Sequence, residues 1–200
     1  PVIKRTVAFI KATDDVGKSM VRYPEFRVCK GAPQIVLGLS HNVEEIRKPV
    51  EERILEYASR GYRALGVAVA EGLEGTEKWE FVGLCPIFDP PRHDTAETIR
   101  RAQELGIGVK MITGDQLPIG KETARLLGMG TNMFTTEVFR EGGVDGKGLV
   151  QGTVTLDQLV EEADGFAEVF PEHKYDIVRR LQDLKHITGM TGDGVNDAPA

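Results

Sequence analysis

A glycine-rich stretch at residues 190–200 has the composition of a cation-binding turn. It reads Met-Thr-Gly-Asp-Gly-Val-Asn-Asp-Ala-Pro-Ala and follows an apolar residue, Ile187. Asp193 and Asp197 offer the hard carboxylate oxygens that Mg²⁺ prefers, and Asn196 could order its water or a phosphate. The alternative is a solvated turn whose Asp and Asn side chains cap their own backbone. The pattern favours a Mg²⁺ site for phosphoryl transfer, a reaction that depends mainly on positioning and charge neutralisation.

A second Thr-Gly-Asp sequence, at residues 113–115, also follows an apolar run. Thr113 could donate its hydroxyl to a phosphate oxygen beside the Gly114 amide, whereas Asp115 would hold another part of a closed site. The plain alternative is a strand-to-helix turn with a local cap at Thr113 or Asp115. Because ligands of parallel sheets bind beyond the carboxyl ends of the strands, two such turns predict one shared site.

Three basic residues could bind phosphate groups. Lys174 stands at the start of a helical pattern, where its ammonium group could lie over the phosphate. Lys30 precedes Gly31 at the end of an expected strand, and the glycine would admit a close ligand. Arg63 could add a forked guanidinium group. For each cation the alternative is a solvated charge, since single basic residues are common at such places.

The first part of the chain predicts an antiparallel arrangement of strands with two helical segments. Strand patterns lie at residues 6–12, 20–23, 26–29, 63–70 and 79–88, and helical patterns at 33–39 and 43–57. Pro49 is expected to begin a new helix or to kink the second one. Gly61 is the expected helix stop.

The composition changes at Asp89-Pro90-Pro91-Arg92, where two prolines predict a stiff, extended hinge between domains of residues 1–88 and 89–200. Helices and strands then alternate. Helical patterns cover 95–105, 118–127 and 175–184, with a capping box at Thr155; strand patterns cover 107–112, 166–170 and 186–190, and 131–151 is typical of a loop. This alternation predicts a parallel sheet with helices on both faces.

The composition argues against several classes of protein. Two hundred residues, of which 40% are apolar, can build a core, and a net charge of −6 disfavours a broad nucleic-acid-binding surface. No apolar run approaches the ~20 residues that cross a bilayer, so this part of the chain is expected to be soluble. Cys29 and Cys85 lie in apolar contexts without metal-ligand spacing, which predicts two buried thiols and no disulfide. The first residue is Pro1 and the last lies within the glycine-rich stretch, so we expect a portion of a longer protein.

These motifs together resemble those of P-type ATPases, and more narrowly those of the proton-pumping plasma-membrane type. The resemblance rests on Lys30-Gly31-Ala32-Pro33, Asp89-Pro90-Pro91-Arg92, Thr113-Gly114-Asp115, Pro171-Glu172-His173-Lys174 and residues 191–199, and its narrower form on residues 88–94, 115–123 and 128–133. It implies a haloacid-dehalogenase-like phosphorylation domain (α/β, with a parallel sheet), preceded by part of an α+β nucleotide-binding domain with an antiparallel sheet.

The resemblance also implies that ATP and Mg²⁺ are the cofactors. Lys30 and Gly31 would line the nucleotide pocket, and Arg63 would contact the phosphates. Asp89 and Arg92 would take part in nucleotide-bound closure.

In the second domain the resemblance implies a phosphoryl site. Its residues would be Thr113 and Gly114 for the phosphoryl group, Asp115 for the closed arrangement, Lys174 for charge neutralisation, Asp193 for Mg²⁺, and Asn196 with Asp197 to complete the site.

The Asp-Lys-Thr-Gly-Thr segment with the phosphorylated aspartate, the membrane helices and the actuator domain are absent from this sequence. We expect them in a longer plasma-membrane protein that holds this portion on its cytoplasmic side. Because the phosphorylated aspartate is missing, this portion would bind nucleotide without autophosphorylating. Without its first central strand, the phosphorylation domain would expose hydrogen-bonding edges and could self-associate. Glu168 stands where calcium pumps tend to carry Arg and proton pumps Gly. A pump for another cation such as calcium, a soluble phosphatase of the same superfamily and a non-enzymatic nucleotide-binding module are the alternatives.

Overall fold

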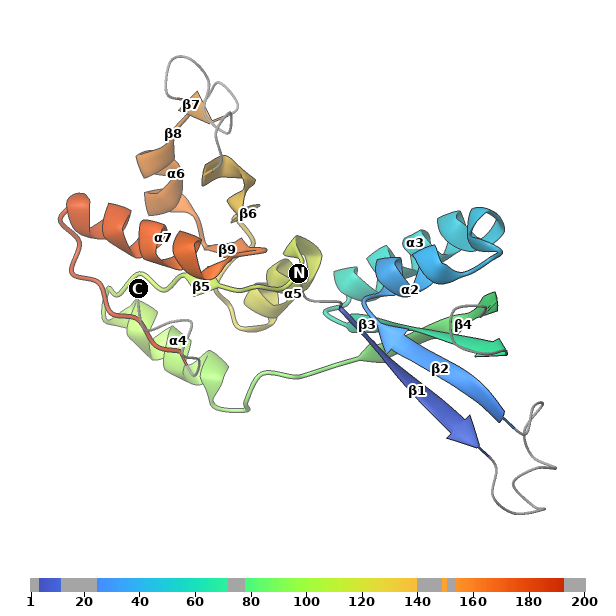
Figure 1. Cartoon of the computed structure of the whole chain (residues 1–200). Helices are drawn as coiled ribbons and strands as arrows, with labels where there is room; N and C mark the ends of the chain where they lie inside the picture. Colours follow the sequence, from blue (N-terminus) through green and yellow to red (C-terminus); the bar gives the residue numbers. More distant parts are fainter. Residues whose placement is uncertain (1–3, 12–24, 72–77, 140–148, 151–153, 193–200) are drawn as a thin grey trace. The chain divides into compact units, whose positions relative to one another are not determined.

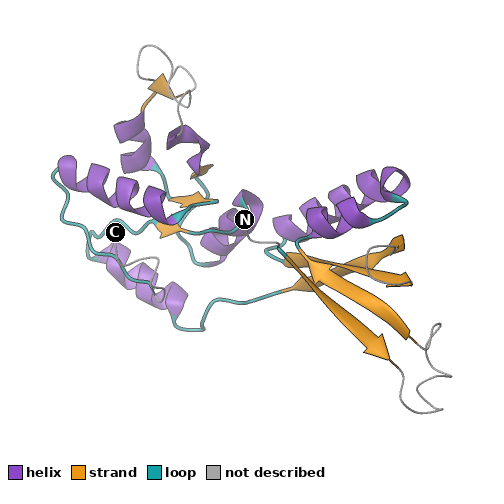
Figure 2. Cartoon of the chain, viewed as in Figure 1, coloured by secondary structure: helices purple, strands orange, loops and turns teal. Residues whose placement is uncertain are grey.

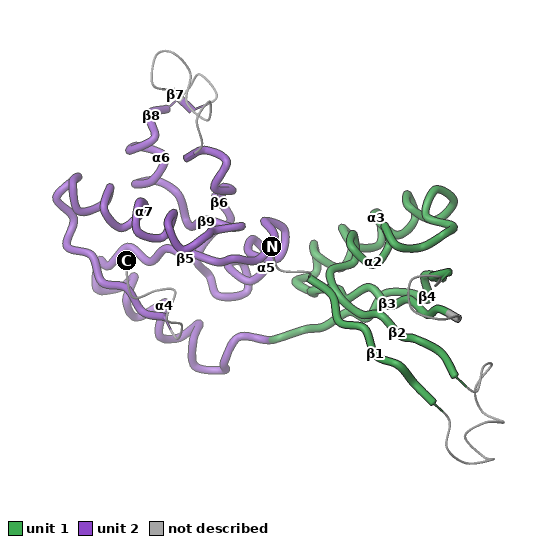
Figure 3. Tube along the Cα trace, in the orientation of Figure 1, with its two compact units in different colours: residues 1–89 green, residues 90–200 purple. Residues whose placement is uncertain are grey.

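The structure is a computed structural model that describes residues 4–11, 25–71, 78–139, 149–150 and 154–192 (Figure 1). The chain divides into two compact units, residues 1–89 and 90–200 (Figure 3). Asp193, Asn196 and Asp197 lie outside the described residues, as does the strand expected at 20–23.

The first unit is an antiparallel sheet with two helices on one face (Figure 2). Its strands are β1 (Arg5–Lys11), β2 (Glu25–Gly31), β3 (Arg63–Glu71) and β4 (Lys78–Ile87), in the order β1-β2-β3-β4. The helices α2 (Pro33–Leu39) and α3 (Val43–Ser59) connect β2 to β3. The antiparallel sheet expected from the sequence is therefore confirmed.

The core of the first unit lies between this sheet and α2. Cys29, Val36 and Ala68 are buried there, and Trp79 and Phe81 pack against them. Cys29 of β2 lies directly opposite Ala68 of β3, so both side chains point to the face that α2 covers.

The second cysteine departs from the prediction. Both thiols are free, as expected, but only Cys29 is buried, and Cys85 is exposed. Cys85 pairs with Leu65, two residues before Val67, and therefore lies on the face opposite Cys29, which α2 leaves uncovered. The apolar sequence around Cys85 did not distinguish the two faces of the strand.

Helix α3 continues through Pro49, so the alternative that Pro49 begins a new helix is wrong. Proline removes its own N–H and leaves the carbonyl four residues earlier without a partner. Residues 47–49 are exposed, so water can bond the Glu45 carbonyl there. The helix ends as predicted before Gly61, whose φ is 78°.

The second unit contains a parallel sheet of short strands. These are β5 (Met111–Ile112), β6 (Met133–Thr135) and β9 (Gly165–Ala167), in the order β5-β9-β6. The other elements are α4 (Thr95–Glu104), α5 (Leu117–Leu126), the 3₁₀ helix η1 (Thr136–Phe139), the antiparallel pair β7 (Leu149–Val150) and β8 (Val154–Thr155), α6 (Leu156–Glu162) and α7 (Pro171–Asp183).

Strand β9 is buried on both faces. Phe166 belongs to a cluster with Val160 of α6 and Ile177 of α7, whereas its neighbour Ala167 belongs to a second cluster with Ala124 of α5. Successive side chains of a strand point to opposite faces, so helices cover both sides of this sheet. The predicted architecture of the second unit is confirmed.

Two strand predictions in this unit are wrong. The strand expected over 107–112 is reduced to Met111–Ile112, and residues 186–192 form neither helix nor strand. Ile187 is fully exposed. A strand depends on hydrogen bonds to a neighbouring strand, and among the described residues none pairs with 186–190.

Two further differences concern element boundaries. Helix α7 begins at Pro171 and not at 175, because proline suits the first helical position, where no N–H is needed. The predicted loop at 131–151 contains β6 and η1.

Candidate functional site

The turn at residues 113–115 directly follows β5 and is fixed to the end of β9. Thr113 donates its backbone N–H to Phe166 O at 2.9 Å, and its carbonyl accepts from Val169 N at 3.0 Å. Asp115 donates its N–H to Thr113 Oγ1 at 3.1 Å, which closes a local turn, but neither residue is the N-cap of α5, which is Gln116. This bond uses a lone pair of the hydroxyl and leaves its proton available for a phosphate oxygen.

Helix α5 packs closely against this turn. A Cβ placed on Gly120 would lie 3.2 Å from Thr113 Cγ2 and 3.5 Å from Ala167 Cβ. Since glycine has no Cβ, the helix can approach the strand ends at this position. The turn is thus held between β9 and α5, and the positive end of the α5 dipole follows it directly.

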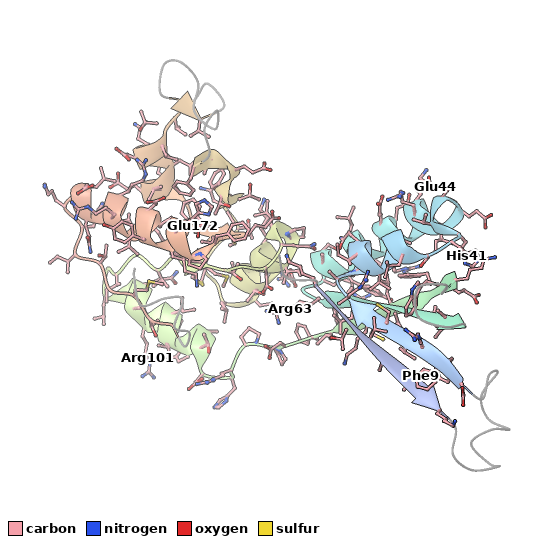
Figure 4. The ribbon with its side chains drawn as sticks, in the orientation of Figure 1. Phe9, His41, Glu44, Arg63, Arg101 and Glu172 are labelled. Atoms are coloured by element: carbon pink, nitrogen blue, oxygen red, sulfur yellow. The ribbon has the colours of Figure 1, made fainter. Side chains whose placement is uncertain are left out.

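Lys174 lies in the first turn of α7, whose start is marked by Glu172 in Figure 4. Its backbone N–H donates to Phe170 O at 3.3 Å, and its side chain is half-buried. Helix α7 follows β9, and the turn at 113–115 follows β5, the parallel neighbour of β9. The structure therefore places the first turn of α7 and the 113–115 turn at the same edge of the sheet.

The described residues contain no group of three or more His, Cys, Asp or Glu side chains that could hold a metal ion. The predicted Mg²⁺ ligands are Asp193 and Asp197, with Asn196 beside them, and their arrangement stays a prediction. Their carboxylate oxygens fit the chemistry of Mg²⁺.

In the first unit, Lys30 and Arg63 share one face of the sheet. Lys30 lies directly opposite Val67, and Arg63 is four residues before Val67 on the same strand, so all three side chains point to the same side. This is the face opposite Cys29, which α2 does not cover. Its centre is apolar, because the half-buried Val28 and Val69 pair there.

Arg63 also contacts another predicted site residue. Arg63, which is labelled in Figure 4, begins β3, and its Nη1 lies 3.8 Å from Asp89 Oδ2. Both side chains are largely exposed, so the pair orients the guanidinium more than it stabilises the fold. Arg92 is exposed, and its carbonyl accepts from Thr95 N at 3.1 Å at the start of α4.

Gly31 has a structural reason for being glycine. A Cβ there would lie 2.3 Å from Lys4 O and 2.6 Å from Arg5 Cα. The close neighbour that requires a glycine is therefore the backbone at the start of β1, whereas the sequence suggested a ligand.

Two residues that support the site, Thr136 and Lys110, are not among those predicted from the sequence. Thr136 is buried, and its hydroxyl donates to Glu168 O at 3.0 Å. Lys110 donates from Nζ to the carbonyls of Glu161 and Ala163, both at 2.6 Å, and so closes the end of α6. Burial lowers the pKa of Lys110, and the nearby carboxylates oppose this effect. None of these three hydrogen bonds has a local sequence signal, since the partners lie 32 to 53 residues apart.

Comparison with known proteins places these observations in a family. A family model described as haloacid dehalogenase-like hydrolase matches residues 2–200. A plasma membrane ATPase of Dunaliella bioculata is 55% identical over 177 residues, which cover 88% of this chain and 16% of that relative. The chain thus spans a small part of the relative it matches. None of the helices in the described part is long and apolar enough to cross a membrane.

Proposed function

Because the chain belongs to the haloacid dehalogenase-like hydrolase family, we propose that it is the cytosolic ATP-binding and phosphoryl-transfer part of a P-type cation pump. The observation that carries this proposal is the 55% identity to a plasma membrane ATPase. The transported ion is proposed to be the proton, and the longer protein to lie in the plasma membrane, with this portion on the cytoplasmic side. Membrane helices and an actuator domain would complete that protein.

The first unit is proposed to bind ATP on the sheet face that carries Lys30 and Arg63. The apolar centre of this face suits a nucleobase, and the two cations suit its phosphates. Asp89 would hold the Arg63 guanidinium in a defined orientation, as their 3.8 Å separation suggests. Asp89 and Arg92 are proposed to take part in nucleotide-bound closure as residues of the linker.

The second unit is proposed to bind the transferred phosphoryl group at the 113–115 turn. Thr113 would donate its hydroxyl and Gly114 its amide to phosphoryl oxygens, while Lys174 would offset their charge. Asp115 would support the closed arrangement through its backbone contacts. These donors are preorganised, because β9 and α5 already fix the turn.

Mg²⁺ would be held by Asp193 and Asp197 with Asn196, and when bound it would neutralise charge on the phosphate. The nucleophile is proposed to be an aspartate in an Asp-Lys-Thr-Gly-Thr segment of the longer protein. This sequence does not contain that segment, so the chain itself is expected to bind nucleotide without becoming phosphorylated.

Calorimetric titration of the chain with ATP tests the nucleotide site. We expect binding that Lys30→Ala and Arg63→Ala each weaken by about tenfold or more, since each removes a charge-assisted hydrogen bond. Lys48→Ala is the matched control, because Lys48 is an exposed cation on α3. Absence of ATP binding, or unchanged binding in Lys30→Ala, would overturn the assignment.

The same titration separates a pump from a soluble phosphatase of the family. A phosphatase would use Thr113 and Lys174 but would have no need of Lys30 or Arg63. In the longer protein, ATP is expected to give an acyl phosphate that hydroxylamine cleaves. A hydroxylamine-resistant phosphoprotein would exclude the aspartyl-phosphate mechanism.

A further inference from the structure

Glu168 has an unusual backbone conformation beside the proposed phosphoryl site. Its φ is 58°, and among the described residues only Lys185 shares a positive φ without being glycine. A Cβ disfavours this left-handed conformation, which glycine adopts readily. A residue that nevertheless holds it must be fixed by its contacts.

Three polar groups of Glu168 make such contacts. Its N–H donates to Asp115 O at 2.9 Å, and its carbonyl accepts from the hydroxyl of Thr136 at 3.0 Å. Its carboxylate Oε1 accepts from Leu117 N at 3.5 Å, a long hydrogen bond. Two of the three bonds go to residues 115–117, which connect the Thr-Gly-Asp turn to α5.

The carboxylate also meets the electrostatic need of α5. Gln116, the N-cap residue, makes no side-chain capping bond, and Pro118 has no N–H to offer. The first N–H groups of a helix lack partners within the helix and carry partial positive charge. Glu168 therefore caps α5 from the end of β9, 51 residues away in the sequence.

We propose that Glu168 is a positioning residue for the phosphoryl-binding turn. Its backbone fixes Asp115, and its carboxylate fixes the first amide of α5, so that Thr113 and Gly114 keep the orientation in which they bind phosphate. The role of the turn rests on the function proposed above, whereas the contacts of Glu168 do not.

Three substitutions separate the carboxylate from the backbone conformation. Glu168→Gln keeps an acceptor for Leu117 N, Glu168→Ala removes it and keeps the unfavourable φ, and Glu168→Gly removes it and relieves the φ. Glu137→Ala, an exposed glutamate of the same unit, is the control.

Amide hydrogen exchange of the 200-residue chain measures the contact directly. The Leu117 amide is expected to exchange about tenfold faster in Glu168→Ala and Glu168→Gly, and within about threefold of the unsubstituted rate in Glu168→Gln. Unchanged exchange in both the Ala and Gly variants would overturn the proposal. A wild-type chain that binds no ATP would refute the proposed function, and the exchange pattern decides the capping contact in that case as well.

Phosphoenzyme formation in the longer protein measures the positioning role. We expect kcat to fall about tenfold in Glu168→Gly with ATP affinity unchanged, and to be largely restored in Glu168→Gln. A purely structural role predicts the opposite for glycine, which should be stable and fully active. Full activity of Glu168→Gly would therefore refute the positioning role.

Discussion

Two glycine-to-alanine substitutions in the first unit are expected to change its stability in opposite directions. Gly31 ends β2, and a Cβ there would meet Lys4 O at 2.3 Å and Arg5 Cα at 2.6 Å. Gly38 lies within α2, and a Cβ there would meet nothing within 4 Å. The two sites thus share the chemistry of the change and differ in the space around it.

The expected changes in stability follow from this difference in space. Both neighbours of Gly31 are backbone atoms, so β1 must move, and overpacking of this kind costs about 1–3 kcal/mol. At Gly38 alanine has the higher helix propensity, by about 1 kcal/mol. For a unit of this size 1 kcal/mol shifts the melting temperature by roughly 4–8 °C, so Gly31→Ala should lower it and Gly38→Ala should raise it by several degrees.

Tryptophan fluorescence can follow the first unit selectively during thermal unfolding. Trp79 is the single tryptophan of the sequence, and it packs against the buried cluster of this unit. A melting temperature for Gly31→Ala equal to or above that of the unsubstituted chain would refute the close approach of β1. A decrease in Gly38→Ala would refute the open helical environment of that residue.

Four further experiments test other parts of the structure. Lys185 follows α7 with a φ of 71°, a conformation that glycine adopts more readily than lysine. Lys185→Gly should therefore raise the free energy of unfolding in urea by about 0.5–1 kcal/mol, and a loss of stability would contradict that geometry. Thr155→Ala should lower the stability of the second unit by about 1 kcal/mol through loss of the capping box with Gln158, and an unchanged urea midpoint would exclude the cap. Iodoacetamide should modify Cys85 in the folded chain and spare Cys29, as peptide mapping can establish. Burial raises the pKa of Cys29 above its ordinary value of 9.0, so its contribution to stability is complete below that pH and is lost as the pH rises through the folded-state pKa. Cys29→Ala should remove this alkaline loss, and an identical pH profile in that variant would refute the assignment.

Local signals predicted many of the elements. The helix at Pro33–Leu39 was predicted with both bounds, because proline suits its first turn. The capping box at Thr155 formed as expected, and Gly61 adopts the positive φ that ends α3. In each case the physical cause lies within a few residues of the element itself.

The errors concern surroundings that a local sequence pattern does not specify. Periodicity gave 186–190 the pattern of a strand, but a pattern does not provide the neighbour with which a strand pairs. The exposure of Cys85 depends on which face of the sheet the helices cover. Pro49 does not begin a new helix, because water can bond the carbonyl that it leaves free at this exposed position.

In the candidate site, too, local sequence predicts the position of a residue but not its distant contacts. The sequence placed Thr113 at a strand end, and the structure places it there. The conformation of Glu168 and its contact with Leu117 could not be predicted, because they depend on the meeting of β9 and α5. The Mg²⁺ assignment to Asp193 and Asp197 stays a prediction.

The burial of β9 on both faces has a consequence for how the second unit reaches a single structure. If β9 slipped by one residue relative to β5 and β6, Phe166 and Ala167 would exchange the sides of the sheet on which they lie. The α5 side has room for nothing larger than the methyl group of Ala167, since even a Cβ added to Gly120 would lie 3.5 Å from Ala167 Cβ. A phenyl ring would collide there, and the cluster with Val160 of α6 and Ile177 of α7 would lose the ring of Phe166. The contrast in size between two adjacent side chains thus selects the correct alignment of this three-residue strand against its shifted competitors.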